Sequence, residues 1–282
     1  MALGNEIREF LSTRRGRITP ERAGLRAYGT RRRVSGLRRE EVAMLAGISV
    51  EYYTQLERGS VSGVSEDVLD AVARALQLDE VERNHLLDLV RAAKQRPTNR
   101  RKTQERVRPG VQRLLESMTY AAAFVRNSRL DILSANALGS SLYSEVFANP
   151  ARPANLARFV FLDRRARDFY VDWDGIADAA AGSLRAAAGR DPYDRALTDL
   201  VGELSMRSAD FRERWAAHDV RQYETGVQRF RHPLVGELTL GYEALSVTSE
   251  VDQTIVAYTA EAGSPAAEAL QRLASWSSAP TA

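Results

Sequence analysis

The chain has 282 residues, of which 44% are hydrophobic and 27% charged, and it contains no cysteine. This length predicts one large domain or two ordinary ones, and the apolar content is sufficient for packed cores. The lack of cysteine excludes disulfide bonds, thiolate zinc sites and cysteine nucleophiles. Neither a secretory signal nor an apolar run of membrane-helix length is present, so we expect a cytoplasmic protein that does not enter the membrane.

Positive charge is concentrated in the first part of the chain. Residues 1–108 hold 22 Lys and Arg against 15 Asp and Glu, a net charge of +7, whereas residues 109–282 hold 18 against 22, a net charge of −4. Eleven arginines fall within residues 8–39. Such a cluster suits DNA, because each phosphate contact releases counterions. A high-GC coding bias explains part of the preference for arginine over lysine, but it does not explain the clustering.

The apolar periodicity of the first hundred residues predicts a series of short helices. The first is expected over 3–14, and a second is expected to start at Thr19-Pro20-Glu21, with proline in its first turn. Residues 24–36 are basic and interrupted by glycine, which predicts a loop or arm. Four further helices are expected, over 38–46 and 50–58, after a cap at Ser65 and after a cap at Asp79.

The periodicity is lost over residues 91–108, which gain charge and contain Pro97, and a second proline, Pro109, follows directly. We therefore predict a DNA-binding domain over 1–93, a linker over 94–109, a second domain over 110–276 and a tail over 277–282.

The second domain combines strand and helix patterns. The predicted strands cover 123–127, 130–135, 227–231, 237–245 and 253–260, and the first two flank an Asn127-Ser128 hairpin turn. The predicted helices cover 112–119, 136–147, 155–170, 173–188, 194–207, 211–218 and 265–276. Strands at both ends with helices between them predict an α+β domain built on an antiparallel sheet.

The segment REEVAMLAGISVEYYTQLERG, residues 39–59, has the pattern of a helix-turn-helix. Gly47 permits a left-handed turn and Ser49 is suited to cap the second helix. A plain helical hairpin is the alternative, and the neighbouring arginines favour DNA. The pattern resembles the Xre/Cro-type helix-turn-helix family, including its Glu57-Arg58-Gly59 ending. The resemblance implies that the second helix lies in the major groove of double-stranded DNA.

Carried over position by position, the resemblance places base contacts at the start of the second helix. The expected base-contacting residues are Val50, Glu51, Tyr52 and Gln55. Gln55 is suited to adenine and Glu51 to cytosine, although Glu51 can equally serve the helix dipole. Expected contacts with phosphate or the minor groove come from Arg31, Arg32, Arg33, Arg38, Arg39, Ser49 and Arg58. We expect Tyr53 to belong to the core.

The resemblance extends into the second domain, through LDILSANALG (130–139), NLARFVFLD (155–163) and RHPLVGELTLGYEAL (231–245). The whole chain resembles actinobacterial regulators in which an all-α helix-turn-helix domain is joined to an MmyB-like, PAS-like α+β domain. The resemblance implies a pocket for a small apolar ligand such as a fatty acid. Because helix-turn-helix dimers bind paired half-sites, we also expect a homodimer. Control by a protein partner without a small ligand remains the alternative.

This sequence departs from the family pattern at two positions. Ala135 precedes Asn136, where the family usually has an aromatic residue, and no proline stands near Ala122. Loss of an aromatic side chain from the wall would enlarge or reshape a ligand pocket. The resemblance therefore predicts the fold of this domain better than it predicts the identity of its ligand.

Large apolar side chains of the second domain are the candidates for a ligand pocket, with a few polar anchors. The apolar candidates are Phe124, Leu133, Leu142, Phe159, Phe161, Trp173, Phe211, Trp215, Leu240 and Tyr242. His218 and His232 are the polar candidates. Ordinary core packing and structural hydrogen bonds are the alternative for each. A metal site is not supported, because no third ligand stands at a suitable spacing.

The sequence contains little that indicates an enzyme. The pairs Asp172 with Asp174 and Asp191 with Asp194 fall at predicted helix starts, where capping explains them. The sequence contains no nucleophile elbow, phosphate-binding loop or dinucleotide fingerprint. We therefore expect neither catalysis nor a cofactor. A minimal antitoxin is also disfavoured, because the second domain is long enough to have its own core.

Overall fold

The structure is a computed structural model, which describes residues 3–25, 34–94, 106–220, 224–250 and 252–277. The chain divides into two compact units. Unit 1 contains Met1–Asn99 together with Arg185–Thr198 and Trp215–Arg221. Unit 2 contains Arg100–Leu184, Asp199–Arg214 and Gln222–Ala282.

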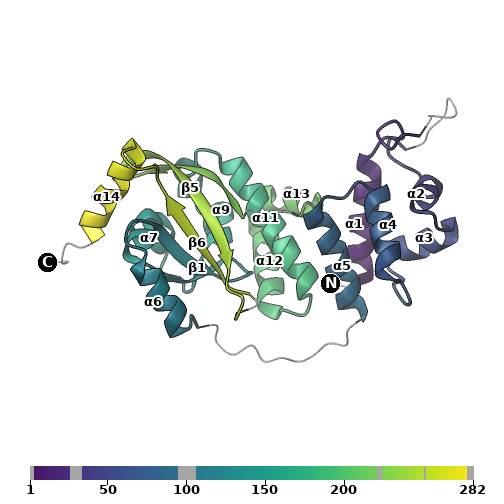
Figure 1. The fold of residues 1–282 in the computed structure, drawn as a ribbon, viewed down its shortest axis with the longest axis horizontal. Coiled ribbons are helices and arrows are strands. Elements are labelled where there is room, and N and C mark those ends of the chain that lie inside the picture. The colour runs from purple at the N-terminus through teal and green to yellow at the C-terminus, as the bar shows by residue number, and fades with distance from the viewer. Residues whose placement is uncertain (1–2, 26–33, 95–105, 221–223, 251, 278–282) are drawn as a thin grey trace. The chain divides into compact units, whose positions relative to one another are not determined.

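Five helices form most of unit 1 (Figure 1). They are α1 (Leu3–Arg17), α2 (Arg39–Ala46), α3 (Val50–Glu57), α4 (Glu66–Ala75) and α5 (Glu80–Lys94). Their shared core includes Ile7, Phe10, Val42, Tyr53 and Leu56, so Tyr53 is buried as predicted. The cap at Ser65 accepts a hydrogen bond from the Val68 N–H, and Asp79 likewise accepts one from Glu82. Both predicted helix starts are confirmed.

The helix predicted at Thr19 is wrong. This segment forms a turn, in which the Ala23 N–H donates to the Thr19 carbonyl at 3.1 Å and Leu25 donates to Pro20 at 2.8 Å. Gly24 has φ of 75°, a left-handed conformation that ends the turn before a second helical turn can form.

The two later segments of unit 1 pack with its helices. Ala186 and Val220 belong to the same apolar core as α1 and α5. Arg14 donates to the His218 carbonyl at 2.7 Å and forms an ion pair with Glu82 at 2.8 Å. These contacts extend α1 to Arg17, three residues beyond the predicted end.

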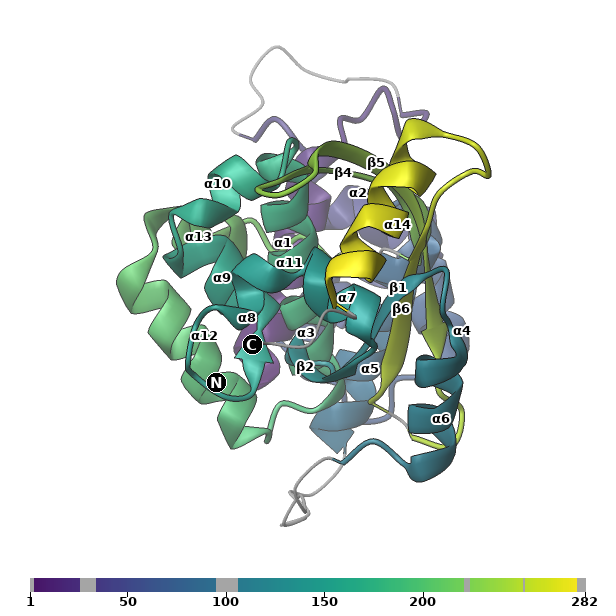
Figure 2. The same cartoon turned by 90° about the vertical axis from the view of Figure 1, so that its left-hand side faces the viewer.

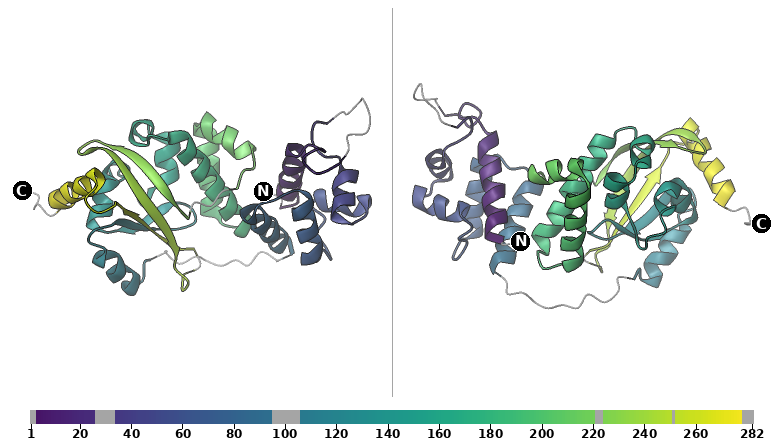
Figure 3. Two further views of the ribbon diagram at one scale, coloured as in Figure 1. Left: turned by 45° about the horizontal axis from the view of Figure 1, so that its top comes forward. Right: turned by 180° about the vertical axis from the view of Figure 1, so that it is seen from behind.

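Unit 2 is built on a six-stranded antiparallel sheet whose strand order is β3-β2-β1-β6-β5-β4. The long, curved β4–β5 hairpin is visible in Figure 3. The strands are β1 (Ala122–Arg126), β2 (Asp131–Ala135), β3 (Ala154–Asn155), β4 (Thr225–His232), β5 (Gly236–Ser246) and β6 (Thr254–Thr259). The early hairpin and the three late strands are confirmed, whereas the short β3 was not predicted.

Nine helices accompany the sheet among the described residues, and the ends of α11, α12 and α13 belong to unit 1. They are α6 (Pro109–Ser117), α7 (Ala137–Leu142), α8 (Ser144–Phe147), α9 (Leu156–Leu162), α10 (Arg165–Phe169), α11 (Trp173–Arg190), α12 (Arg195–Arg207), α13 (Ala209–Ala216) and α14 (Pro265–Ser277). The predicted helix over 155–170 is interrupted, because Asp163 adopts an extended conformation that ends α9. Tyr143, with φ of −98° and ψ of 27°, leaves the helical conformation and separates α7 from α8 within 136–147.

Alternate residues of each strand point to opposite faces of the sheet. On one face, Ala123, Val125 and Ile255 pack with Leu115 of α6. On the other face, Phe124 contacts Tyr143 and Tyr258. Helix α14 lies against α7 and β5, as Figure 2 shows. Unit 2 is therefore an α+β layer structure, as the sequence predicts.

None of the helices in the described part of the chain is both long enough and apolar enough to span a bilayer.

Candidate nucleic-acid interface and ligand cavity

The turn between α2 and α3 has the geometry that its sequence predicts. Gly47 adopts φ of 67°, and its N–H donates to the Met44 carbonyl at 3.2 Å. Ile48 then donates to Ala43 at 3.0 Å, and the Ser49 Oγ accepts from the Tyr52 N–H at 3.1 Å. The two short helices are thereby held at a fixed crossing, with α3 starting at Val50.

Helix α3 has one buried face and one face open to solvent. Tyr53 and Leu56 are fully buried in the core. Val50, Glu51 and Gln55 are exposed, and Tyr52 is half-buried. Three of the four residues expected to read bases thus lie on the solvent side of a single helix, where a major groove could receive them, whereas Tyr52 packs partly against the core.

A buried carboxylate fixes the other end of α3. The side chain of Glu57 is only 1% exposed and accepts hydrogen bonds from Arg15 at 2.9 and 3.2 Å. Arg39 adds two more, from Nε at 3.0 Å and from Nη2 at 2.8 Å. Burial raises the pKa of Glu57, but the hydrogen bonds from the two arginines outweigh burial, so its pKa is lowered. Glu57 is therefore ionised, and its ion pairs hold the last turn of α3 in place.

The residues expected to contact phosphate differ in their exposure and in their protein partners. Arg39 is engaged by Glu57, with 46% of its side chain exposed. Arg38 pairs with Glu40 at 3.2 Å, and Arg58 is exposed at the end of α3. The Ser49 hydroxyl is used in the helix cap, although the residue is exposed. Arg31, Arg32 and Arg33 lie outside the described residues.

Unit 2 contains a cavity of about 210 Å³ on the face of the sheet that Phe124 occupies. Strands β1, β4, β5 and β6 and helix α11 contribute most of its lining. The lining residues are Phe124, Arg126, Leu130, Tyr143, Leu156, Val160, Tyr170, Asp172, Gly175, Ile176, Ala179, Ala180, Ser183, Val227, Gln228, Tyr242, Ala244, Val256 and Tyr258. Most of this surface is apolar or aromatic, as is usual for small-molecule sites.

Two of the ligand candidates proposed from sequence, Phe124 and Tyr242, line the cavity. Leu142, Phe159, Phe161, Phe211 and Leu240 are buried elsewhere in the core of unit 2. Leu133 packs with the cluster around Leu115 under α6, and Trp215 and His218 belong to unit 1.

The two histidine candidates have protein partners. His218 lies 3.0 Å from the Glu9 carboxylate. Nε2 of His232 is 3.0 Å from the Ser141 carbonyl, and its Nδ1 accepts from the Leu234 N–H at 3.2 Å. Neither ring lines the cavity, so structural hydrogen bonding describes both positions.

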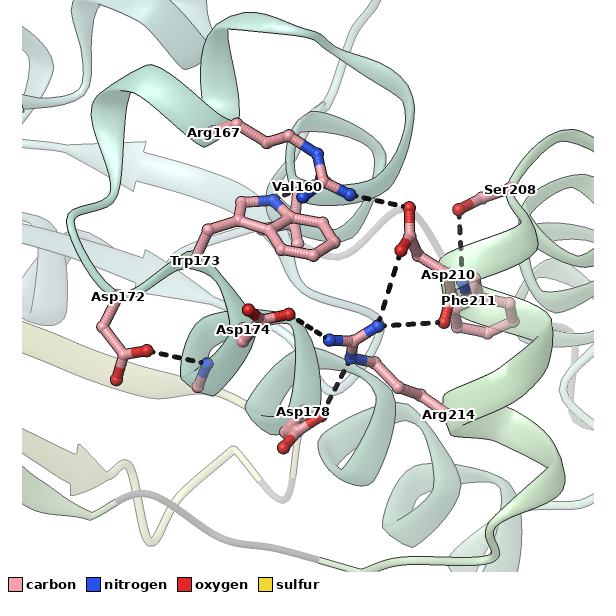
Figure 4. Close-up of polar contacts among 11 residues, drawn as sticks. Val160, Arg167, Asp172, Trp173, Asp174, Asp178, Ser208, Asp210, Phe211 and Arg214 are labelled. Carbon is pink, nitrogen blue, oxygen red and sulfur yellow. Dashed lines mark hydrogen bonds and ion pairs between the residues drawn. The ribbon is translucent and has the colours of Figure 1, made fainter.

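Trp173, also considered as a ligand contact, is packed between two arginines beside the cavity. The guanidinium carbons of Arg167 and Arg214 lie 3.7 and 5.1 Å from its ring centre, on opposite sides of the indole in Figure 4. The indole Nε1 donates to the Val160 carbonyl at 3.1 Å. Arg214 also pairs with Asp174 at 2.6 Å and with Asp178 at 2.8 Å. This cluster holds the first turns of α11, which form one wall of the cavity.

Sequence reasoning missed the small residues that create the cavity. Gly175, Ala179 and Ser183 are spaced four residues apart on α11 and all line it. A stripe of small side chains facing aromatic residues leaves unfilled volume, and this spacing is visible in the sequence. The wall tyrosines Tyr143, Tyr170 and Tyr258 carried no comparable pattern. Ala135 is not among the lining residues.

The aspartate pairs have structural partners. Asp172 accepts from the Gly175 N–H at 3.1 Å and Asp194 from the Leu197 N–H at 3.2 Å, so both cap helices as predicted. Asp174 instead pairs with Arg214. Across the described ranges, His, Asp and Glu form no group of three that could hold a metal ion.

Comparison with known proteins gives two family matches. A helix-turn-helix domain model matches residues 14–86. A second model, for the MmyB-like transcription regulator ligand binding domain, matches residues 107–273. No curated protein is similar enough to count as a match. Because the second model covers more than half of the chain, the protein belongs to the MmyB-like transcription regulators, in which a DNA-binding helix-turn-helix precedes a ligand-binding domain.

Proposed function

We propose that this protein is a sequence-specific transcription regulator that acts in the cytoplasm as a homodimer. The observation that carries the proposal is the solvent-exposed face of α3, on which Val50, Glu51 and Gln55 stand together above a fixed helix crossing. Helix-turn-helix dimers bind two half-sites about one helical turn apart, so we expect a site with two-fold symmetry. Residues 1–93 carry the DNA contacts in this proposal, residues 94–109 form the linker, and residues 110–276 carry the ligand site.

Individual roles follow from side-chain chemistry. Gln55 pairs with adenine, Val50 contacts a thymine methyl group and Glu51 accepts from cytosine, with Tyr52 alongside. Arg31, Arg32, Arg33, Arg38 and Arg58 neutralise phosphates or enter the minor groove. The guanidinium group of Arg39 contacts phosphate through its exposed side, while its other side remains paired with Glu57.

The ligand-binding domain modulates DNA binding in this proposal. Its cavity suits a small apolar molecule, and a fatty acid is the class that the family resemblance suggests. Regulation is then a coupling free energy between cavity and DNA, so the ligand changes DNA affinity and DNA changes ligand affinity by the same factor.

In vitro site selection with the purified full chain tests the proposal. We expect enrichment of a short inverted repeat, with sub-micromolar binding at about 100 mM salt. Enrichment of no sequence, or binding that is equal on all duplexes, would contradict specific regulation. Enrichment of a single asymmetric half-site would contradict the dimer.

A further inference from the structure

Helix α11 contributes residues to both compact units of the chain. Its residues up to Leu184 belong to unit 2, and those from Arg185 to Arg190 belong to unit 1. The helix has 18 residues, so it is about 27 Å long. The unit that contains the cavity and the unit that contains α3 therefore share one helix. This inference rests on the proposed function, because it concerns how the cavity regulates DNA binding.

In unit 2, the first half of α11 forms a wall of the cavity. Gly175, Ala179 and Ser183 line the cavity at a spacing of four residues, together with Ile176 and Ala180. A molecule that enters the cavity therefore contacts side chains of α11. Because protein interiors are closely packed, an added molecule displaces the elements that it touches. A ligand thus acts directly on the position of α11.

In unit 1, the end of α11 is packed against other helices. Ala186 belongs to the same apolar core as Ile7 of α1 and Leu86 of α5. Gly189 lies against the ring of His85, and a Cβ added to Gly189 would be only 2.5 Å from a ring carbon. A shift of this end of α11 therefore displaces α1 and α5 as well.

A buried ion pair joins α11 to α1. The side chain of Arg185 is only 3% exposed, and its Nη1 donates to the Glu6 carboxylate at 2.7 Å. Its Nη2 donates to the Trp215 carbonyl, and the guanidinium carbon lies 3.8 Å from the centre of the Trp215 ring. Separating the two charges of a buried pair is strongly destabilising. Movement of α11 is therefore transmitted to Glu6 and to the rest of α1.

Helix α1 continues this connection to α3. Arg15, which lies on the same helix as Glu6, donates to the Glu57 carboxylate at 2.9 and 3.2 Å. Glu57 is the last residue of α3, whose exposed face carries Val50 and Gln55. Helix α1 thus has one ion pair with α11 and another with α3. Rigid helices joined by such pairs can carry energetic coupling between distant sites.

We propose that α11 transmits the state of the cavity to the DNA-binding face, and that the signal passes through two ion pairs, Arg185 with Glu6 and Arg15 with Glu57. A ligand that shifts α11 changes the orientation of α1, and α1 in turn changes the orientation of α3. Arg185 and Glu6 are positioning residues, because they belong neither to the cavity lining nor to α3. Their loss should therefore remove the regulation while specific DNA binding is retained.

A substitution that fills the cavity replaces the unidentified ligand in the test. Ala179→Leu adds volume at the α11 wall and acts as a permanent occupant. Anisotropy titration of the full chain with the duplex from site selection should show that this substitution changes DNA affinity at least fivefold, the lower end of usual allosteric coupling. In the Arg185→Met background, the same substitution should change DNA affinity less than twofold. Ser183→Val takes its place if Ala179→Leu does not fold.

Controls isolate the cavity and the ion pair. Ala209→Leu adds the same side chain at an exposed position of α13 in unit 2, and it should leave DNA affinity unchanged. Arg207→Met breaks an exposed pair with Glu203, and it should leave the effect of the cavity-filling variant intact. Glu6→Gln removes the other charge of the buried pair and should reproduce Arg185→Met. Circular dichroism and urea unfolding establish that each variant is folded.

Hydrogen exchange of the α1 amides, measured without DNA, gives a second readout of the same signal. Ala179→Leu should change the exchange rates of these amides at least threefold. This change should disappear in the Arg185→Met background, because the signal no longer reaches α1.

The outcomes separate this inference from the proposed function. Where specific DNA binding is intact, an affinity that Ala179→Leu leaves unchanged, or changes equally in the Arg185→Met and Glu6→Gln backgrounds, would overturn the inference and leave the regulator standing. Absence of specific DNA binding would overturn the proposed function. In that case the role of α11 is decided by exchange in α1, and exchange that is unchanged, or changed equally in both backgrounds, would overturn it.

Discussion

Arg39 and Glu57 join the first residue of α2 to the last residue of α3, with Nε and Nη2 of the arginine 3.0 and 2.8 Å from one carboxylate oxygen. Arg15 of α1 binds the same carboxylate from another side. Three helices of unit 1 therefore converge on one buried charge. The exposed face of α3 depends on this ion pair for its orientation as well as on the Ser49 cap.

Removal of the carboxylate should destabilise unit 1. Glu57→Ala leaves two arginines without their partner, and loss of one member of a buried ion pair costs about 3–5 kcal/mol. The urea midpoint of the full chain measures this loss. Glu40→Ala breaks the exposed pair with Arg38 and is the control, with an expected loss of about 0–1 kcal/mol. Equal midpoints for the two variants would show that the buried network contributes little.

His85 should make stability depend on pH. Burial, together with the positive charges of Arg185 and Arg14, lowers the pKa of His85 to about 3. The unfolded chain takes up a proton near pH 6.5 that the folded chain refuses until about pH 3, so stability falls as pH drops through this window. From pH 7 to pH 5 we expect a loss of about 2 kcal/mol from this residue.

The variant His85→Leu isolates this contribution. Its urea midpoint should change less between pH 7 and pH 5 than that of the natural chain, whatever its absolute stability. An identical pH dependence in both proteins would mean that His85 is accessible to protons in the folded state.

Gly59 should not tolerate a side chain. It has φ of 87°, and a Cβ added there would overlap the backbone of Gly4. A left-handed conformation alone costs a residue other than glycine about 1–2 kcal/mol, and the overlap adds to this. We therefore expect Gly59→Ala to lower the free energy of unfolding by at least about 2 kcal/mol. Gly16→Ala, at an α1 position with open space around it, should be neutral or stabilising by up to about 1 kcal/mol. The reverse order of stabilities would contradict the close approach of the two glycines.

Local patterns predicted most of the fold. The turn at Gly47, the caps at Ser49 and Ser65 and the hairpin after β1 depend on residues close in sequence, and each occurs where it was expected. The predictions failed where a single turn and a helix differ little in local energy. At Thr19, for example, the chain forms one turn that ends at Gly24 instead of a helix.

The same distinction between local and long-range determinants applies to the two candidate sites. Exposure of Val50, Glu51 and Gln55 follows from helical periodicity and was predictable. The cavity was not, because selecting large apolar residues identifies the core, whereas a cavity arises where small residues such as Ala179 face a sheet. Which tyrosines meet on this face of the sheet depends on contacts between distant parts of the chain, as between Tyr143 at the end of α7 and Tyr258 of β6.

Gln55 should contribute specificity. Gln55→Ala removes both the donor and the acceptor suited to adenine, and we expect a loss of about 1–3 kcal/mol on the selected site, with relaxed preference at one base pair. Fluorescence anisotropy on matched and mismatched duplexes measures both effects. Gln271→Ala, at an exposed position of α14, is the control and should leave affinity unchanged. A uniform loss on every duplex would assign Gln55 to the backbone.

Arg58 should contribute affinity without specificity. Neutralising one phosphate contact lowers the slope of log affinity against log salt by about 1, so Arg58→Ala should weaken all sequences alike and flatten the salt dependence. Titrations at several salt concentrations give the slope. An unchanged slope would place Arg58 away from the phosphates.

The most direct test of the account is anisotropy titration of duplex DNA with the full chain and with a double variant, Gln55→Ala and Val50→Ala, on the exposed face of α3. We predict that the natural chain binds its selected duplex at least a thousandfold more tightly than random DNA, and that the variant keeps its fold but loses most of this ratio. If the variant retains the full ratio, or if the natural chain does not discriminate between the duplexes, α3 does not read the DNA sequence.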